Sequence, residues 1–113
     1  MSIKRFGSGP RMSQAVTHNG VVYLAGQVAE GDSVAAQTSD ILANIDTLLA
    51  EVGSDKSRIL STTIWITNMA DFAEMNAVWD TWVDPANPPA RACTEAALAL
   101  PKFKVEIMVT AAL

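Results

Sequence analysis

The order in which two helical segments interrupt a series of β-prone runs constrains this fold most. Apolar residues recur with helical spacing over residues 33–52 and again over residues 72–82. The remaining apolar runs are short and rich in β-branched residues, so the predicted order is β-β-β-α-β-α-β-β. Strands outnumber helices and do not alternate strictly with them. We therefore expect residues 1–113 to form a single α+β domain, with one sheet and both helices on one of its faces.

Turn and breaker residues place the strand boundaries. Asn19-Gly20 is a strong hairpin signal between two β-prone runs, and Gly26 and Gly31 then open a loop. The predicted strands are residues 3–7 at an edge, the hairpin within residues 13–29, and residues 57–68, 90–96 and 103–111.

Capping residues place the helix ends. Asp32 or Ser33 is expected to cap the first helix, and Gly53 stands where a C-terminal cap belongs. Asp71 and Glu74 have the spacing of a capping box, which predicts the start of the second helix.

Composition excludes several classes of function. The chain of 113 residues is 50% apolar, and this excess in a small domain indicates a buried subunit interface. The net charge is −4 and the basic residues are scattered, so no nucleic-acid partner is expected. No apolar run approaches the roughly 20 residues that span a membrane, and the N-terminus lacks a secretory signal. The lone cysteine, Cys93, excludes an internal disulfide and fits a reducing cytoplasm.

The last two predicted strands carry charges where a plain core strand would not. Side chains alternate along a strand, so Arg91 and Cys93 share one face, and Glu106 lies opposite the apolar series of residues 105, 107 and 109. Helices normally cover the more apolar face of a sheet. We therefore predict that Arg91, Cys93 and Glu106 all project from the uncovered face.

Two interpretations of these charges remain open from spacing alone. The first is an exposed cross-strand ion pair, worth about 0.5 kcal/mol. The second is a site completed by another subunit, in which Arg91 binds a carboxylate and Glu106 orients or deprotonates a water. Cys93 would then form a small apolar wall with a weak donor.

Three motifs in this order resemble the Rid (YjgF) family of reactive-intermediate deaminases, also labelled endoribonuclease L-PSP. "PPARACTEAALALPKFKVEI" carries the family pattern of P-A-R-x-C, then L-P, then V-E-I. Upstream, "VVYLAGQVA" resembles the strand that ends in S/A-G-Q, and "DFAEMNAVWDTW" resembles the D-F-x-x-x-N helix start. Together the motifs cover nearly the whole chain.

The resemblance implies a fold, an assembly and a set of site residues. The fold would be chorismate-mutase-like, a single mixed sheet with two helices on one face, assembled as a homotrimer with sites between subunits. By position, Arg91 matches the carboxylate-binding arginine and Glu106 the glutamate that holds the attacking water. Cys93, Gly26 and Asn76 match residues that line the substrate.

Two departures from the family pattern mark a divergent subgroup. Ala25 stands where the family has a serine, and Met12 or Arg11 replaces a tyrosine that follows Gly-Pro. Both positions would line the substrate, so the departures bear on the choice of substrate more than on the fold.

The resemblance also implies an activity, which is hydrolysis of 2-imino acids such as 2-aminoacrylate to 2-keto acids and ammonia. Neither a metal nor an organic cofactor is expected. A non-catalytic trimer that binds a small carboxylate is the alternative. RNA cleavage is a third interpretation, which the acidic net charge disfavours.

Overall fold

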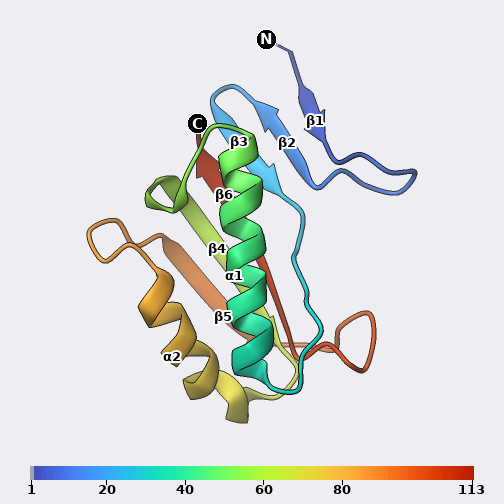
Figure 1. Ribbon diagram of the computed structural model, residues 1–113, viewed down its shortest axis with the longest axis vertical. Helices are drawn as coiled ribbons and strands as arrows, with labels where there is room; N and C mark the ends of the chain where they lie inside the picture. Colours follow the sequence, from blue (N-terminus) through green and yellow to red (C-terminus); the bar gives the residue numbers. More distant parts are fainter. Residues whose placement is uncertain (1) are drawn as a thin grey trace.

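A computed structural model describes residues 2–113, and six strands form one sheet in the order β1-β2-β3-β6-β4-β5 (Figure 1). Neighbouring strands are antiparallel except for β4 and β5, which are parallel, so the sheet is mixed. The strands are β1 (Lys4–Phe6), β2 (Ala15–His18), β3 (Val21–Leu24), β4 (Ile59–Ile66), β5 (Ala90–Glu95) and β6 (Val105–Ala112).

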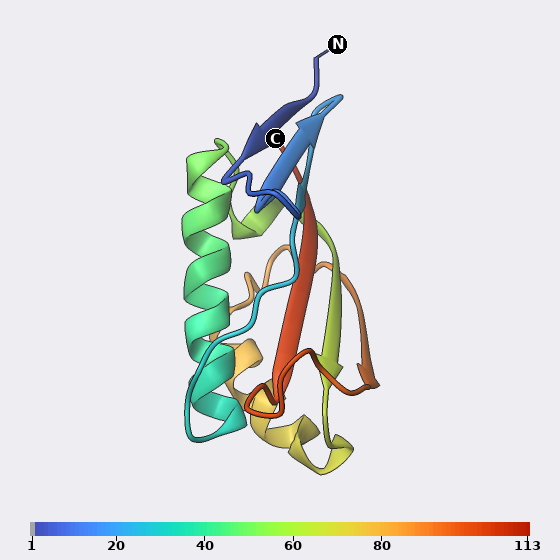
Figure 2. The ribbon, with the colours of Figure 1, turned by 90° about the vertical axis from the view of Figure 1, so that its right-hand side faces the viewer.

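Both helices lie on the same face of this sheet, as the sequence predicts (Figure 2). Helix α1 (Val34–Glu51) connects β3 to β4, and α2 (Phe72–Trp82) connects β4 to β5. Each connection joins two strands that run in the same direction, and such crossovers are right-handed. Because both crossovers advance across the sheet in the same direction, both helices reach one face. We call this the helix face and the other the open face.

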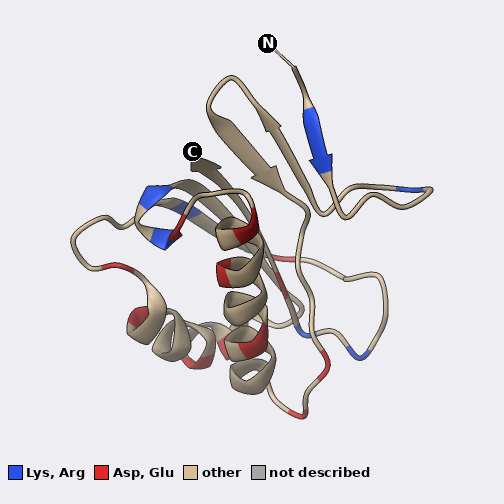
Figure 3. Ribbon diagram, turned by 45° about the horizontal axis from the view of Figure 1, so that its top comes forward, with Lys and Arg blue, Asp and Glu red and all other residues tan. Residues whose placement is uncertain are grey.

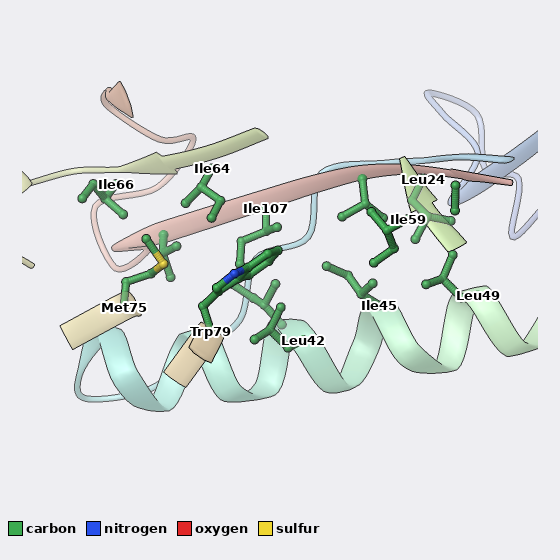
Figure 4. Close-up of a cluster of buried hydrophobic side chains, with 14 of the residues drawn as sticks. Leu24, Leu42, Ile45, Leu49, Ile59, Ile64, Ile66, Met75, Trp79 and Ile107 are labelled. Carbon is green, nitrogen blue, oxygen red and sulfur yellow. The ribbon is translucent and has the colours of Figure 1, made fainter. Parts of the chain in front are cut away.

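The hydrophobic core lies between the helices and the helix face (Figure 4). Ile41, Ile45 and Leu49 form the buried stripe of α1. In the close-up (Figure 4), Ile45 and Leu49 point toward Leu24 and Ile59 of the sheet. These three α1 side chains are fully buried, as the helical spacing in the sequence predicts. No helix in the described part of the chain has the length and hydropathy to cross a membrane.

The predicted hairpin and the first helix are confirmed at their ends. Asn19 and Gly20 both have positive φ angles, 52° and 77°, as a tight β-hairpin turn requires. Ser33 caps α1, since its hydroxyl oxygen accepts a hydrogen bond from the amide of Ala36 at 3.0 Å. Gly53 follows the last turn of α1 with a φ of 83°.

The capping box predicted at Asp71 and Glu74 does not form, although α2 begins at Phe72 as the prediction places it. A short 3₁₀ turn precedes α2, and Asn68 caps that turn by accepting from the amide of Ala70. Asp71 is already within the turn and makes no side-chain cap bond. Glu74 instead accepts from the amide of Ala35 at 2.9 Å. It therefore stabilises the N-terminus of the other helix, where a negative charge is favourable.

Neither helix covers the open face, which carries apolar side chains. Tyr23 of β3 is 51% exposed and Met108 of β6 is 39% exposed. Trp65 of β4 faces the same side and is half-buried. Exposed apolar groups over a broad sheet face are typical of a surface that binds another protein.

A fully buried amide from α1 joins two loops at one end of the sheet. The side chain of Gln37 donates to the carbonyl oxygens of Gly31 and Lys102, each at 3.0 Å, and accepts from the amide of Lys104 at 2.8 Å. These loops lead into the segment that contains Gly26 and into β6. Three backbone groups thus depend on one side chain.

We expect Gln37→Ala to lower the free energy of unfolding by about 2–3 kcal/mol, because it leaves buried backbone groups without partners. Urea unfolding measures this change. Asn44→Ala, on the exposed side of the same helix, is the matched control and should stay within about 0.5 kcal/mol of the parent. Equal stability of the two variants would contradict the structural role of Gln37.

Candidate functional site

The structure places Arg91 and Cys93 on the helix face, so the prediction that they project from the open face is wrong. In the parallel ladder Arg91 is aligned with Thr62 and Cys93 with Ile64. Aligned residues of adjacent strands project to the same face. Thr62 and Ile64 are both buried beneath the helices, and Cys93 packs against the core.

The physical reason is that α2 provides partners for a guanidinium. The prediction assigned the helix face to the more apolar series of β5, but β5 is the edge strand and lies beside a helix of only 11 residues. Phe72, Asn76 and Trp79 follow i, i+4, i+7 spacing on α2 and so share one face of it. This face is partly polar, which makes Arg91 acceptable beneath it.

The guanidinium of Arg91 is held in a defined orientation. Its Nη1 donates to Oδ1 of Asn76 at 2.8 Å, and its Cζ lies 5.2 Å from the ring centroid of Trp79 and 6.0 Å from that of Phe72. Within residues 2–113, no carboxylate forms an ion pair with Arg91. The side chain is half-buried, oriented and uncompensated, which are the properties of an anion-binding arginine.

Cys93 is two residues along the same strand face. Burial raises the pKa of the Cys93 thiol, and the positive charge of Arg91 partly opposes this increase. The thiol is therefore protonated at neutral pH, and its chemistry is that of a small apolar wall rather than a nucleophile.

Glu106 lies on the open face, as predicted. It stands in β6 between Val105 and Ile107, which are both buried on the helix face, and it is aligned with Trp65 of β4. Its carboxylate rests against Gly26, because a Cβ added to Gly26 would lie 2.1 Å from Oε2 of Glu106. Any larger residue at position 26 would displace the Glu106 carboxylate from this place.

Backbone pairing fixes Gly26 against Glu106. Gln27 exchanges two backbone hydrogen bonds with Ile107, at 2.8 and 3.1 Å. On the other side of Gly26, the amide of Ala25 donates to the carbonyl oxygen of Gln14 at 2.9 Å. Ala25, Gly26 and Glu106 are therefore brought together.

Met12 is not brought to either group within one chain. It lies in the loop between β1 and β2, which extends away from the sheet, and it is 48% exposed (Figure 1). This loop returns at Gln14, whose side-chain oxygen accepts from the Gln27 amide group at 3.1 Å.

The predicted site residues thus form two half-sites on opposite faces of the sheet. The arginine half-site consists of Arg91, Cys93 and Asn76, and the glutamate half-site consists of Ala25, Gly26 and Glu106. One chain does not bring them together, so the predicted convergence of Arg91 and Glu106 fails within a single subunit. The contact of Trp79 with Arg91 is a feature of the arginine half-site that the sequence motifs do not predict. The i, i+4, i+7 spacing of Phe72, Asn76 and Trp79 is the sequence signal that these side chains share one face of α2.

The basic side chains of residues 2–113 do not form a stripe. Lys and Arg lie on several separate elements, interspersed with acidic groups (Figure 3). No group of three or more His, Cys, Asp or Glu side chains in the described residues has metal-binding geometry.

The fold and the half-sites define a small α+β protein with an oriented arginine on one face of its sheet and a carboxylate on the other. The family described as Endoribonuclease L-PSP matches residues 3–113. A RutC family protein from Haemophilus ducreyi is 49% identical over 98% of this chain and 97% of its own length. The RutC family protein YoaB of Escherichia coli is 42% identical over 99% of each chain.

A solved structure is similar to this chain over nearly its whole length. The crystal structure of NMB1025, a YjgF family member from Neisseria meningitidis, is 52% identical and has a TM-score of 0.97 over 99% of this chain and 95% of that one. The chain therefore belongs to the endoribonuclease L-PSP family, the group that also carries the names YjgF and RutC.

We expect Gly26→Ala to displace the Glu106 carboxylate while the fold persists. The added methyl meets the far end of a flexible side chain, so the free energy of unfolding should change by less than about 1 kcal/mol. A crystal structure of the variant measures the displacement. Gly9→Ala is the control, because its Cβ meets no atom closer than 3.9 Å. An unmoved Glu106 would contradict the contact.

We expect Arg91→Ala to raise the pKa of Cys93 further, because it removes the positive charge that favours the thiolate. The pH dependence of iodoacetamide alkylation measures this, and the single cysteine makes the assignment unambiguous. Arg58→Ala, a surface control paired with Asp55, should leave the profile unchanged. A lower pKa in Arg91→Ala would refute the electrostatic coupling.

Proposed function

We propose that this protein is a deaminase that hydrolyses 2-imino acids to 2-keto acids and ammonia. The observation that carries this proposal is the guanidinium of Arg91, which Asn76 and Trp79 orient and which has no carboxylate partner among residues 2–113. One nitrogen of the guanidinium is committed to Asn76, and its Nε and Nη2 edge makes no hydrogen bond within the described chain. That edge matches the two oxygens of a substrate carboxylate.

The reaction requires positioning more than activation, because a protonated imine is already a strong electrophile. Arg91 fixes the carboxylate, and Glu106 orients a water toward the imine carbon and accepts its proton. The new C–O bond gives a carbinolamine. Glu106 then returns the proton to nitrogen. As the C–N bond breaks, Glu106 accepts the hydroxyl proton, so the carbonyl of the 2-keto acid forms and ammonia leaves. The released ammonia takes up this proton as ammonium. Each step conserves charge and needs no redox partner.

Because the half-sites lie on opposite faces of one sheet, the proposed active site combines two chains. Arg91, Cys93 and Asn76 come from one subunit, and Ala25, Gly26 and Glu106 come from its neighbour. The exposed apolar side chains of the open face, including Tyr23 and Met108, support burial against another copy. We propose a homotrimer, in which each interface provides one site.

A second candidate function is binding of a small carboxylate without turnover. Ala25 favours it, because this residue supplies no hydroxyl beside Gly26 and Glu106 where the family pattern has a serine. RNA cleavage has less support, since the net charge of −4 and the scattered basic residues provide no surface for phosphates.

We expect the protein to accelerate the loss of 2-imino acids generated by an amino-acid oxidase. Arg91→Ala should reduce kcat/KM about a hundredfold or more, because two charge-assisted hydrogen bonds are lost. Glu106→Gln should reduce kcat by about 10² to 10⁴. Arg58→Ala is the surface control and should retain parent activity.

Two outcomes would contradict the proposal. If Arg91→Ala clears the imine as fast as Arg58→Ala, the carboxylate role of Arg91 is wrong. If the parent binds a 2-keto acid through Arg91 but does not clear imines, the protein is a carboxylate-binding member of the family.

A further inference from the structure

The Trp79 ring has a fixed position in the core. Its side chain is only 6% exposed, and it packs among the buried residues beneath α2 (Figure 4). The Arg91 guanidinium carbon lies 5.2 Å from the centroid of this ring. This distance is within the range of a cation–π contact, and burial of the ring strengthens such a contact.

We propose that Trp79 is a positioning residue that fixes the plane of the Arg91 guanidinium for carboxylate binding, an inference that rests on the proposed function. Arg91 stands on an edge strand, where a long side chain can adopt many rotamers in solvent. A receptor that is already ordered loses less conformational entropy when a ligand binds.

Asn76 alone does not supply this order. Its single hydrogen bond holds Nη1 at 2.8 Å but permits rotation of the guanidinium about that contact. The Trp79 ring restricts this rotation, because the cation lies against one fixed aromatic surface. Phe72 contributes less, since its centroid is 6.0 Å away and its side chain is 38% exposed.

The restricted rotation of the Arg91 guanidinium determines which of its edges can bind a ligand. With Nη1 bonded to Asn76 and the plane fixed by Trp79, the Nε and Nη2 edge is the one available to a carboxylate. The substrate and the transition state carry the same carboxylate, so Trp79 contributes equally to the binding of both. Its loss should therefore raise KM and leave kcat unchanged.

The test uses Trp79→Leu, Trp79→Phe and the matched control Trp82→Leu. The ring centroid of Trp82 lies 5.3 Å from that of Trp79, with the two planes tilted by 53°, and the cation over the Trp82 ring is Lys56 rather than Arg91. We expect Trp79→Leu to raise KM for 2-imino acids about fivefold at constant kcat. Trp79→Phe keeps an aromatic surface and should restore most of the affinity. Trp82→Leu should lower the melting temperature without changing KM.

A second readout needs no substrate. The charge of Arg91 lowers the pKa of Cys93, so the alkylation profile of the single cysteine reports where the guanidinium lies. In Trp79→Leu the midpoint should shift upward toward that of Arg91→Ala. In Trp79→Phe and Trp82→Leu it should stay at the parent value.

The two readouts separate the failure of this inference from the failure of the proposed function. If the parent shows no imine turnover but the Cys93 midpoint shifts in Trp79→Leu alone, the positioning contact stands and the deaminase proposal fails. If Trp79→Leu and Trp82→Leu give the same KM and the same midpoint, Trp79 is only a core residue and the inference is overturned.

Discussion

The alternation of side chains between the two faces of β4 determines where Arg91 and Glu106 lie. This strand pairs with both strands that carry the charged residues, and it aligns Thr62 with Arg91 and Trp65 with Glu106. Positions 62 and 65 differ by an odd number, so their side chains project to opposite faces of the sheet. Hydrogen-bonded ladders on both sides of β4 fix this relation. No rotamer change can bring Arg91 and Glu106 of one chain onto the same face.

This separation gives each half-site a different kind of support. The arginine half-site lies at the sheet edge, where Asn76 and Trp79 of α2 orient the guanidinium. The glutamate half-site lies on the open face, where the Gly26 backbone leaves room for the Glu106 carboxylate. Each half is ordered within its own chain, so association of two copies would complete a site without rearrangement. Such preorganisation suits a reaction that mainly needs a carboxylate and a water held in place.

The sequence was sufficient to predict the elements, their order and the layer architecture. Helical spacing identified both helices, and Asn19-Gly20 and Ser33 marked a turn and a cap that the structure confirms. These signals are local, so they depend little on the rest of the fold. The alternation of Val105 and Ile107 also predicted correctly which side of β6 is buried.

Local patterns do not predict contacts with residues that are distant in the sequence. The alternation along β5 predicts Arg91 on the open face, whereas Asn76 and Trp79 of α2 hold it on the helix face. Glu74 was assigned to its own helix, but it contacts the amide of Ala35 on the other one. Spacing within one helix or strand cannot reveal either partner, because the two groups of each pair meet only when the chain crosses from one strand to the next.

Mixing two inactive variants tests the central claim of a site shared between chains most directly. Arg91→Ala and Glu106→Gln are denatured together, refolded and assayed for imine hydrolysis. In a cyclic trimer assembled at random, roughly a quarter of the interfaces combine an intact arginine from one chain with an intact glutamate from the other. Recovery of about that fraction of parent activity is the predicted result. Activity no higher than that of either variant refolded alone, in a mixture shown to contain mixed trimers, would contradict the claim.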